Sequence, residues 1–145
     1  QPDHAYFGQK DAQQAEVLKR MVKDLFFNVK LRIMPIVREA DGLAKSSRNT
    51  YLSKSERAAA VILSSSLETA SMLFKAGERS SQKLAEGVKK LIGDEPMAQI
   101  DYVEIYALPG LTPAPEVLTK GQYLLALAVK FGTTRLIDNV ILEVE

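Results

Sequence analysis

Two long apolar runs near the end of the chain constrain its fold more than any other feature. Residues 123–131 and 135–144 are rich in aliphatic and β-branched side chains, and only the Gly-Thr-Thr segment 132–134 separates them. Such runs, joined by a short turn that contains glycine, are typical of a β-hairpin. A further strand-like run covers 100–106. We therefore predict an antiparallel three-stranded sheet in this part of the chain.

A pair of helices is expected immediately before these strands. Ser53 and Glu56 have the spacing of a capping box, in which each side chain satisfies a free backbone N–H group of the other residue. Apolar residues then recur at helical spacing as far as Gly77, and a further helix is expected over 80–93. Helices followed by antiparallel strands indicate the α+β class.

The beginning of the chain has a different pattern. A short apolar run ends at Gly8, an amphipathic helix is predicted over 11–27, and a strand is predicted in 29–37. Strand, helix and strand in this order form a βαβ unit, whose two strands are normally parallel. We therefore divide the chain into a βαβ portion, 1–36, and an α+β domain, 37–145.

Composition excludes several classes of function. The 145 residues are 46% hydrophobic, and 19 basic against 18 acidic residues give a net charge of +1. The chain therefore lacks the excess of basic residues that is typical of nucleic-acid binding. The chain has no cysteine, so disulfides and thiolate metal sites are excluded. No apolar run approaches the ~18–20 residues of a membrane span. We expect a cytoplasmic protein without a nucleic-acid or membrane partner.

Two short polar segments carry residues suited to phosphate chemistry. Lys10 stands where a predicted strand ends and a helix begins, and the start of a helix offers free N–H groups to an anion. Arg48 follows Ser46 and Ser47 in a polar loop, and its guanidinium can hold two phosphate oxygens at once. Either segment alone would usually be a solvated loop or a helix cap. Together they indicate a nucleotide triphosphate site.

The same segments, with two others, resemble signature segments of the pantothenate synthetase (pantoate–β-alanine ligase) family. The similar segments are FGQKDAQQ at 7–14, PIVREADGLA at 35–44, SSRNTYL at 46–52 and GTTRLIDN at 132–139. The resemblance therefore extends from one end of the chain to the other. It implies condensation of pantoate with β-alanine through a pantoyl adenylate, with ATP as a substrate, Mg²⁺ beside it, and AMP and pyrophosphate as products.

The resemblance also implies a domain organisation. Residues 1–36 would be the end of a Rossmann-like nucleotidylyltransferase domain that binds ATP and pantoate, and 37–145 would be a C-terminal lid domain with a KMSKS-like loop. The family is homodimeric, and its HxGH-type motif lies upstream of anything present here. We therefore expect a C-terminal portion that is inactive without the missing N-terminal domain. His4 matches no functional position of the family.

Four residues of the first segment receive roles from the resemblance. Lys10 would be catalytic, since it contacts phosphates and stabilises the charge that develops during adenylate formation. Gly8 and Asp11 match positions that approach the ATP ribose. Gln14 matches a glutamine that orients pantoate by hydrogen bonding.

The later segments receive the remaining roles. Ser46, Ser47 and Arg48 are the counterpart of the KMSKS loop that grips the triphosphate, so they would bind ATP and act in catalysis. Val37 matches a position whose backbone meets the adenine at the hinge. Lys45 departs from the family pattern, in which an apolar residue is common here. No protein metal ligand is assigned.

Two other interpretations are open at this point. Another adenylate-forming nucleotidylyltransferase would share the lysine and the basic loop, although the Gln13-Gln14 pair disfavours it. Alternatively, the chain is a non-catalytic α+β structural or interaction domain. An ATP-dependent thermal shift would distinguish that inert module from an ATP site.

Overall fold

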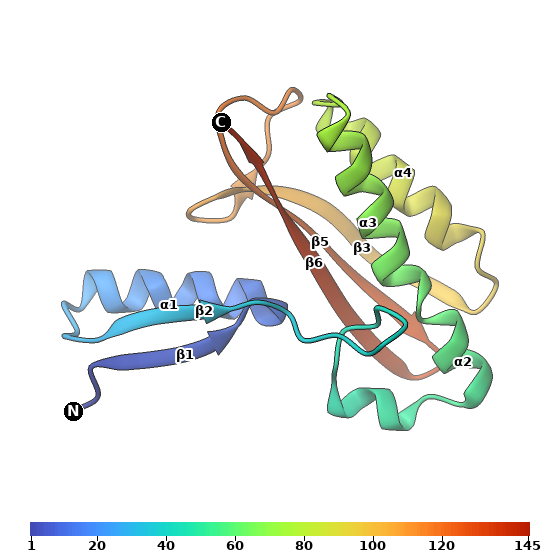
Figure 1. Cartoon of the computed structure of the whole chain (residues 1–145), viewed down its shortest axis with the longest axis horizontal. Coiled ribbons are helices and arrows are strands. Elements are labelled where there is room, and N and C mark those ends of the chain that lie inside the picture. Colours follow the sequence, from blue (N-terminus) through green and yellow to red (C-terminus); the bar gives the residue numbers. More distant parts are fainter.

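The computed structural model describes all of residues 1–145 and has an α+β fold, as predicted (Figure 1). A small strand–helix–strand unit at the N-terminus leads through an extended loop to a larger sheet, and helices cover one face of this sheet. None of the helices is both long and apolar enough to cross a membrane.

The N-terminal unit consists of β1 (His4–Gly8), the 3₁₀ turn η1 (Gln9–Asp11), α1 (Ala12–Asp24) and β2 (Lys30–Met34). The strands β1 and β2 pair in parallel, as the pattern predicted. The helix ends before the predicted residue 27, because Phe26 adopts a left-handed φ of +52° that an α-helix cannot contain.

The larger sheet has the strand order β4-β3-β5-β6 and is antiparallel throughout. Its three long strands are those predicted, namely β3 (Ala98–Leu108), β5 (Gly121–Phe131) and β6 (Thr134–Val144). The fourth, β4 (Thr112–Pro113), adds two residues at the edge of β3 and is too short to produce an alternating sequence pattern. The hairpin turn is shorter than predicted, since Thr134 already pairs with Phe131.

The helical segment before the sheet differs from the prediction in one respect. Ser53 and Glu56 form the predicted capping box, but the helix that they begin, α2 (Lys54–Ala59), is short. After a tight turn, α3 (Ile62–Lys75) continues, so the single helix predicted up to Gly77 was wrong. The apolar spacing runs on through the break, and the sequence therefore does not reveal it. The last helix, α4 (Ser81–Gly93), is capped by Ser80.

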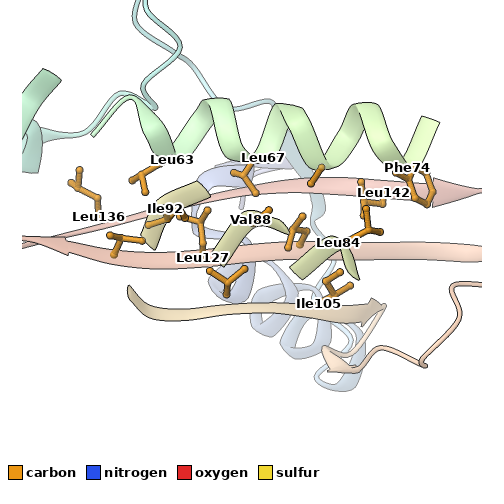
Figure 2. Packing of buried hydrophobic residues seen from close by; sticks show 14 of the residues in the cluster. Leu63, Leu67, Phe74, Leu84, Val88, Ile92, Ile105, Leu127, Leu136 and Leu142 are labelled. Carbon is orange, nitrogen blue, oxygen red and sulfur yellow. The ribbon is translucent and has the colours of Figure 1, made fainter. Parts of the chain in front are cut away.

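The main core lies between α3, α4 and one face of the sheet (Figure 2). Successive residues of a strand point to opposite faces, so alternate residues of β5, such as Leu125 and Leu127, face the helices. Their neighbours Leu124 and Ala126 face the other way and are also buried. The first turns of α1 lie against this second face, where Ala15 and Leu124 line the same cavity. The sheet thus holds the N-terminal unit in place.

Candidate functional site

A cavity of about 440 Å³ lies between the start of α1 and the second face of the sheet. Polar residues from three parts of the chain line it, with backbone or side-chain atoms: Lys10, Asp11, Gln13 and Gln14 near the start of α1, Tyr102 and Tyr106 on β3, and Arg135, Asp138 and Asn139 on β6. The N-terminal unit and the larger sheet therefore both contribute residues to this cavity.

Lys10 lies in the turn η1 between β1 and α1 and is partly buried. The pKa of Lys10 lies below its ordinary value, mainly because burial disfavours the charged ammonium. The positive charge of Arg48 also lowers this pKa, whereas the carboxylates of Asp11 and Asp138 raise it. The turn η1 and the segment Ser47–Tyr51, which carries Arg48, both contact β6, although they are distant in the sequence. Neither the Lys10 ammonium nor the Arg48 guanidinium has an ion-pair partner. Two unpaired cations that repel one another favour a bound polyanion.

The loop that carries Arg48 has a defined backbone. Ser46 caps the 3₁₀ turn η2 (Ser47–Tyr51), where its Oγ accepts a hydrogen bond from the backbone N of Arg48 at 3.2 Å. Asn49 donates from Nδ2 to the carbonyl of Ala44 at 3.1 Å and ties the turn to the preceding residues. The local fold therefore leaves the Arg48 side chain exposed and free to reach a ligand.

Not every residue assigned by resemblance lies in the cavity. Lys10, Asp11 and Gln14 line it, whereas Gly8 ends β1 and is exposed without lining it. Val37 is also exposed, and its carbonyl accepts a hydrogen bond from the backbone N of Lys45 at 2.9 Å, at the neck of the loop. The structure therefore brings Lys10, Asp11 and Gln14 together at the cavity and leaves Gly8 and Val37 outside its lining.

The loop residues Lys45, Ser46, Ser47 and Arg48 likewise lie outside the cavity lining. Ser46 is partly buried and Ser47 is exposed. Lys45, the departure from the family pattern, lies 3.9 Å from a carboxylate oxygen of Glu39. This ion pair partly neutralises the added charge and distinguishes Lys45 from the unpaired Lys10 and Arg48.

Several residues at the cavity had no role from the sequence. Tyr106 donates a hydrogen bond to Glu104, which raises the pKa of Tyr106 to about 12. Arg135 pairs with Asp101 at 2.8 Å. Their signal in the sequence is polar or aromatic side chains at alternate positions of otherwise apolar strands, on the face away from the helices.

Comparison with known proteins identifies the family. The family model described as pantoate-beta-alanine ligase matches residues 1–141. This chain belongs to the pantoate-beta-alanine ligase family. The family prediction from the sequence segments is thereby confirmed.

Named relatives of this ligase family agree. The pantothenate synthetase of Pelotomaculum thermopropionicum is 57% identical over 97% of this chain and 49% of its own length. That of Acetivibrio thermocellus is 56% identical over 99% of this chain and 50% of its own length. The chain therefore spans about half the length of these relatives.

Solved structures of ligase-family members share the fold. The pantothenate synthetase of Thermus thermophilus matches with a TM-score of 0.86 at 37% identity, over 96% of this chain and 49% of that one. The pantoate-beta-alanine ligase of Francisella tularensis, complexed with beta-gamma ATP and beta-alanine, matches with a TM-score of 0.63 at 26% identity. That match covers 97% of this chain and 44% of the Francisella protein.

The proximity of Lys10 and Arg48 in this ligase-family chain predicts a measurable coupling. Arg48→Ala removes a positive charge that lowers the pKa of Lys10, so the pKa of Lys10 is expected to rise. NMR titration of the Lys10 Cε and Nζ resonances measures this pKa. Lys45→Ala is the matched control, because Lys45 is paired with Glu39 and should leave Lys10 unaffected. An unchanged Lys10 titration in the Arg48 variant would show that the two side chains are not neighbours.

Proposed function

We propose that this chain forms one side of the ATP site of a ligase that condenses pantoate with β-alanine. The observation that carries this proposal is that β6 contacts both η1 and η2, the two segments that carry the unpaired cations Lys10 and Arg48. Membership of the ligase family supports it. So does the Francisella tularensis relative, whose structure contains beta-gamma ATP and beta-alanine.

In the proposed first step, a carboxylate oxygen of pantoate attacks the α-phosphorus of ATP and pyrophosphate leaves. Negative charge accumulates on the phosphate oxygens, and fixed cations that face those oxygens stabilise the transition state. Lys10 supplies a charge at the start of α1, where free backbone N–H groups add to it. Arg48 would hold phosphate oxygens from the loop at η2, and Ser46 and Ser47 would shape the loop and add hydroxyl and amide donors.

In the proposed second step, the amine of β-alanine attacks the acyl carbon of pantoyl adenylate. AMP leaves, the nitrogen loses a proton, and the new C–N bond is that of pantothenate. Gln14 lines the cavity, where its amide group would hydrogen-bond pantoate and then the pantoyl group. Asp11 and Gly8 would approach the ribose, and the Val37 backbone would meet the adenine at the loop neck.

Magnesium would enter this site with the nucleotide. The chain has no group of three or more His, Cys, Asp or Glu side chains that would hold a metal ion. Mg²⁺ commonly keeps several waters and binds through one or two carboxylates and substrate phosphates, so it would be held largely by ATP itself. Asp11, which is exposed beside Lys10, is the carboxylate nearest in sequence to the proposed phosphate site.

We further propose that 1–36 is the end of a Rossmann-like domain and 37–145 is a lid domain with a KMSKS-like loop. The large exposed apolar side chains of the first unit support this division, since Val17, Leu25 and Phe26 are 60%, 61% and 91% exposed. Such a surface suits contact with the part of the family's length that this chain does not span. The assembled enzyme would be a cytoplasmic homodimer.

Reconstitution tests the proposed function. This chain is mixed with a separately produced N-terminal half of the Pelotomaculum thermopropionicum relative, and AMP release is measured with ATP, pantoate and β-alanine. We expect turnover that requires both chains and all three substrates, because each chain holds part of the site. Each chain alone, at the same concentration, is the control.

Two results would count against the proposal. Robust turnover by this chain alone would show that it contains the complete site. No turnover despite verified association of the two chains would favour a non-catalytic α+β domain.

A further inference from the structure

Asn139 on β6 is joined to the backbone that carries Lys10. It is 3% exposed, and its Nδ2 donates hydrogen bonds to the carbonyls of Gln9 at 3.0 Å and Lys10 at 3.1 Å. Its Oδ1 accepts a hydrogen bond from the Gln9 side chain at 3.2 Å. One buried amide therefore fixes both peptide groups of the turn in which Lys10 lies, across most of the length of the sequence.

The preceding residue holds the loop that leads to Arg48. Asp138 is 1% exposed and accepts two hydrogen bonds from Arg38, at 2.7 and 2.9 Å. Arg38 also donates to the carbonyl of Gly42 at 3.0 Å, and its backbone forms a β-bridge with Ala44. A bidentate guanidinium–carboxylate pair fixes orientation as well as distance, so the root of the loop is oriented by β6.

Strand geometry explains how two neighbours can hold two segments. Adjacent residues of β6 point to opposite faces of the sheet, so Asp138 faces the loop and Asn139 faces the turn at Lys10. The backbone N of Asn139 also donates to Asp138 Oδ1 at 2.7 Å. The polar groups of this dipeptide are thus satisfied within one network, and such buried networks are rigid.

We propose that Asp138 and Asn139 are positioning residues that set the separation of Lys10 and Arg48. The proposal rests on the proposed function, in which both cations contact one triphosphate. A misplacement of about 1 Å in a catalytic constellation can cost roughly 100-fold in rate, so a rigid connection between the two segments has a large effect on the chemistry. Neither Asp138 nor Asn139 needs to touch the substrate.

The spacing of the two segments can be measured directly, without any activity. Because the chain has no cysteine, Lys23→Cys on α1 and Tyr51→Cys at the end of η2 give two specific spin-label sites, both exposed. Double electron–electron resonance then reports the distance between the two segments. We expect Asn139→Ala to widen the distance distribution at least about two-fold, since it removes all three side-chain hydrogen bonds to the turn.

Two further variants keep this test decisive. Arg38→Lys retains the charge but loses the two-pronged contact with Asp138, so it should fold and still widen the distribution. Tyr123→Phe is the matched control, because it removes one partly buried hydrogen bond, to the Thr119 carbonyl at 3.1 Å, away from the cavity. It should leave the distribution unchanged. An unchanged distribution in Arg38→Lys and in a folded Asn139→Ala would overturn the proposal.

The reconstituted enzyme gives a second readout that separates positioning from stability. Asn139→Ala is expected to lower kcat about 10- to 100-fold with little change in the KM for β-alanine, and Tyr123→Phe is expected to change neither. If the unsubstituted reconstituted enzyme is inactive, but the variants still widen the distance distribution, the proposed function is refuted and the role of Asp138 and Asn139 in holding the two segments stands. If the unsubstituted enzyme is active and Asn139→Ala leaves its kcat unchanged, only the positioning role is refuted.

Discussion

Replacing Lys10 by alanine is expected to lower kcat for AMP release about 100- to 1,000-fold in the reconstituted enzyme. This is the range observed when a single preorganised donor to a developing negative charge is removed. The effect should be large because Lys10 is partly buried, has no ion-pair partner in the free chain and is held by its backbone to β6. The measurement is steady-state AMP release with saturating ATP, pantoate and β-alanine.

Lys23→Ala is the matched control for this prediction. Lys23 is in the last turn of α1, the helix that follows the turn at Lys10. It is exposed and lies outside the cavity lining, so its loss removes one positive charge without touching the proposed site. Its kcat should stay near that of the parent. Equal losses in the Lys10 and Lys23 variants would mean that the rate depends on overall charge and not on the position of Lys10.

Replacing Arg38 by alanine is expected to lower the free energy of unfolding by about 3–5 kcal/mol. That is the usual cost of removing one partner of a buried ion pair, because the remaining charge is left without compensation. Here the remaining group is the carboxylate of Asp138, which is 1% exposed. Urea unfolding followed by circular dichroism gives the free energy, and an unchanged m-value would show that the cooperative unit is intact.

An ion pair with an exposed carboxylate serves as the comparison. Arg57 contacts Asp41 at 2.8 Å, and the two arginines are about equally accessible, but the Asp41 side chain is 43% exposed and that of Asp138 is 1% exposed. Arg57→Ala should therefore be much less destabilising than Arg38→Ala, since water solvates the freed carboxylate. Similar losses from the two substitutions would contradict the account of Asp138 as a buried carboxylate that depends on Arg38.

Local features of the fold could be predicted because their causes are local. The capping box at Ser53 and Glu56 depends on residues three positions apart, and the turn at Gly132 separates two obvious strands. The end of α1 could not be predicted in this way, since the left-handed conformation of Phe26 has no signal in the apolar spacing. The break between α2 and α3 was also missed, because the apolar spacing continues through it unchanged.

In the candidate site, too, residues within recognisable short segments could be predicted, and residues that act through long-range contacts could not. Lys10 and Arg48 could be proposed because a cation at a helix start and a basic hydroxyl-containing loop are recognisable in short segments. Asp138 and Asn139 received no role, although they lie within a segment that resembles the family. Their partners are Arg38, Gln9 and Lys10, which only the folded chain brings to β6. Long-range polar contacts of this kind require the structure.

The central claim is that Lys10 and the loop at Ser46–Arg48 bind one triphosphate together. Titration of ATP into the isotope-labelled chain, followed by backbone amide NMR, tests this claim most directly. The account predicts that the amides of Lys10, Asp11 and Ser46–Arg48 shift with a single common dissociation constant, and that Lys10→Ala weakens the shifts in both segments. Independent titration of the two segments, or shifts confined to one of them, would contradict it.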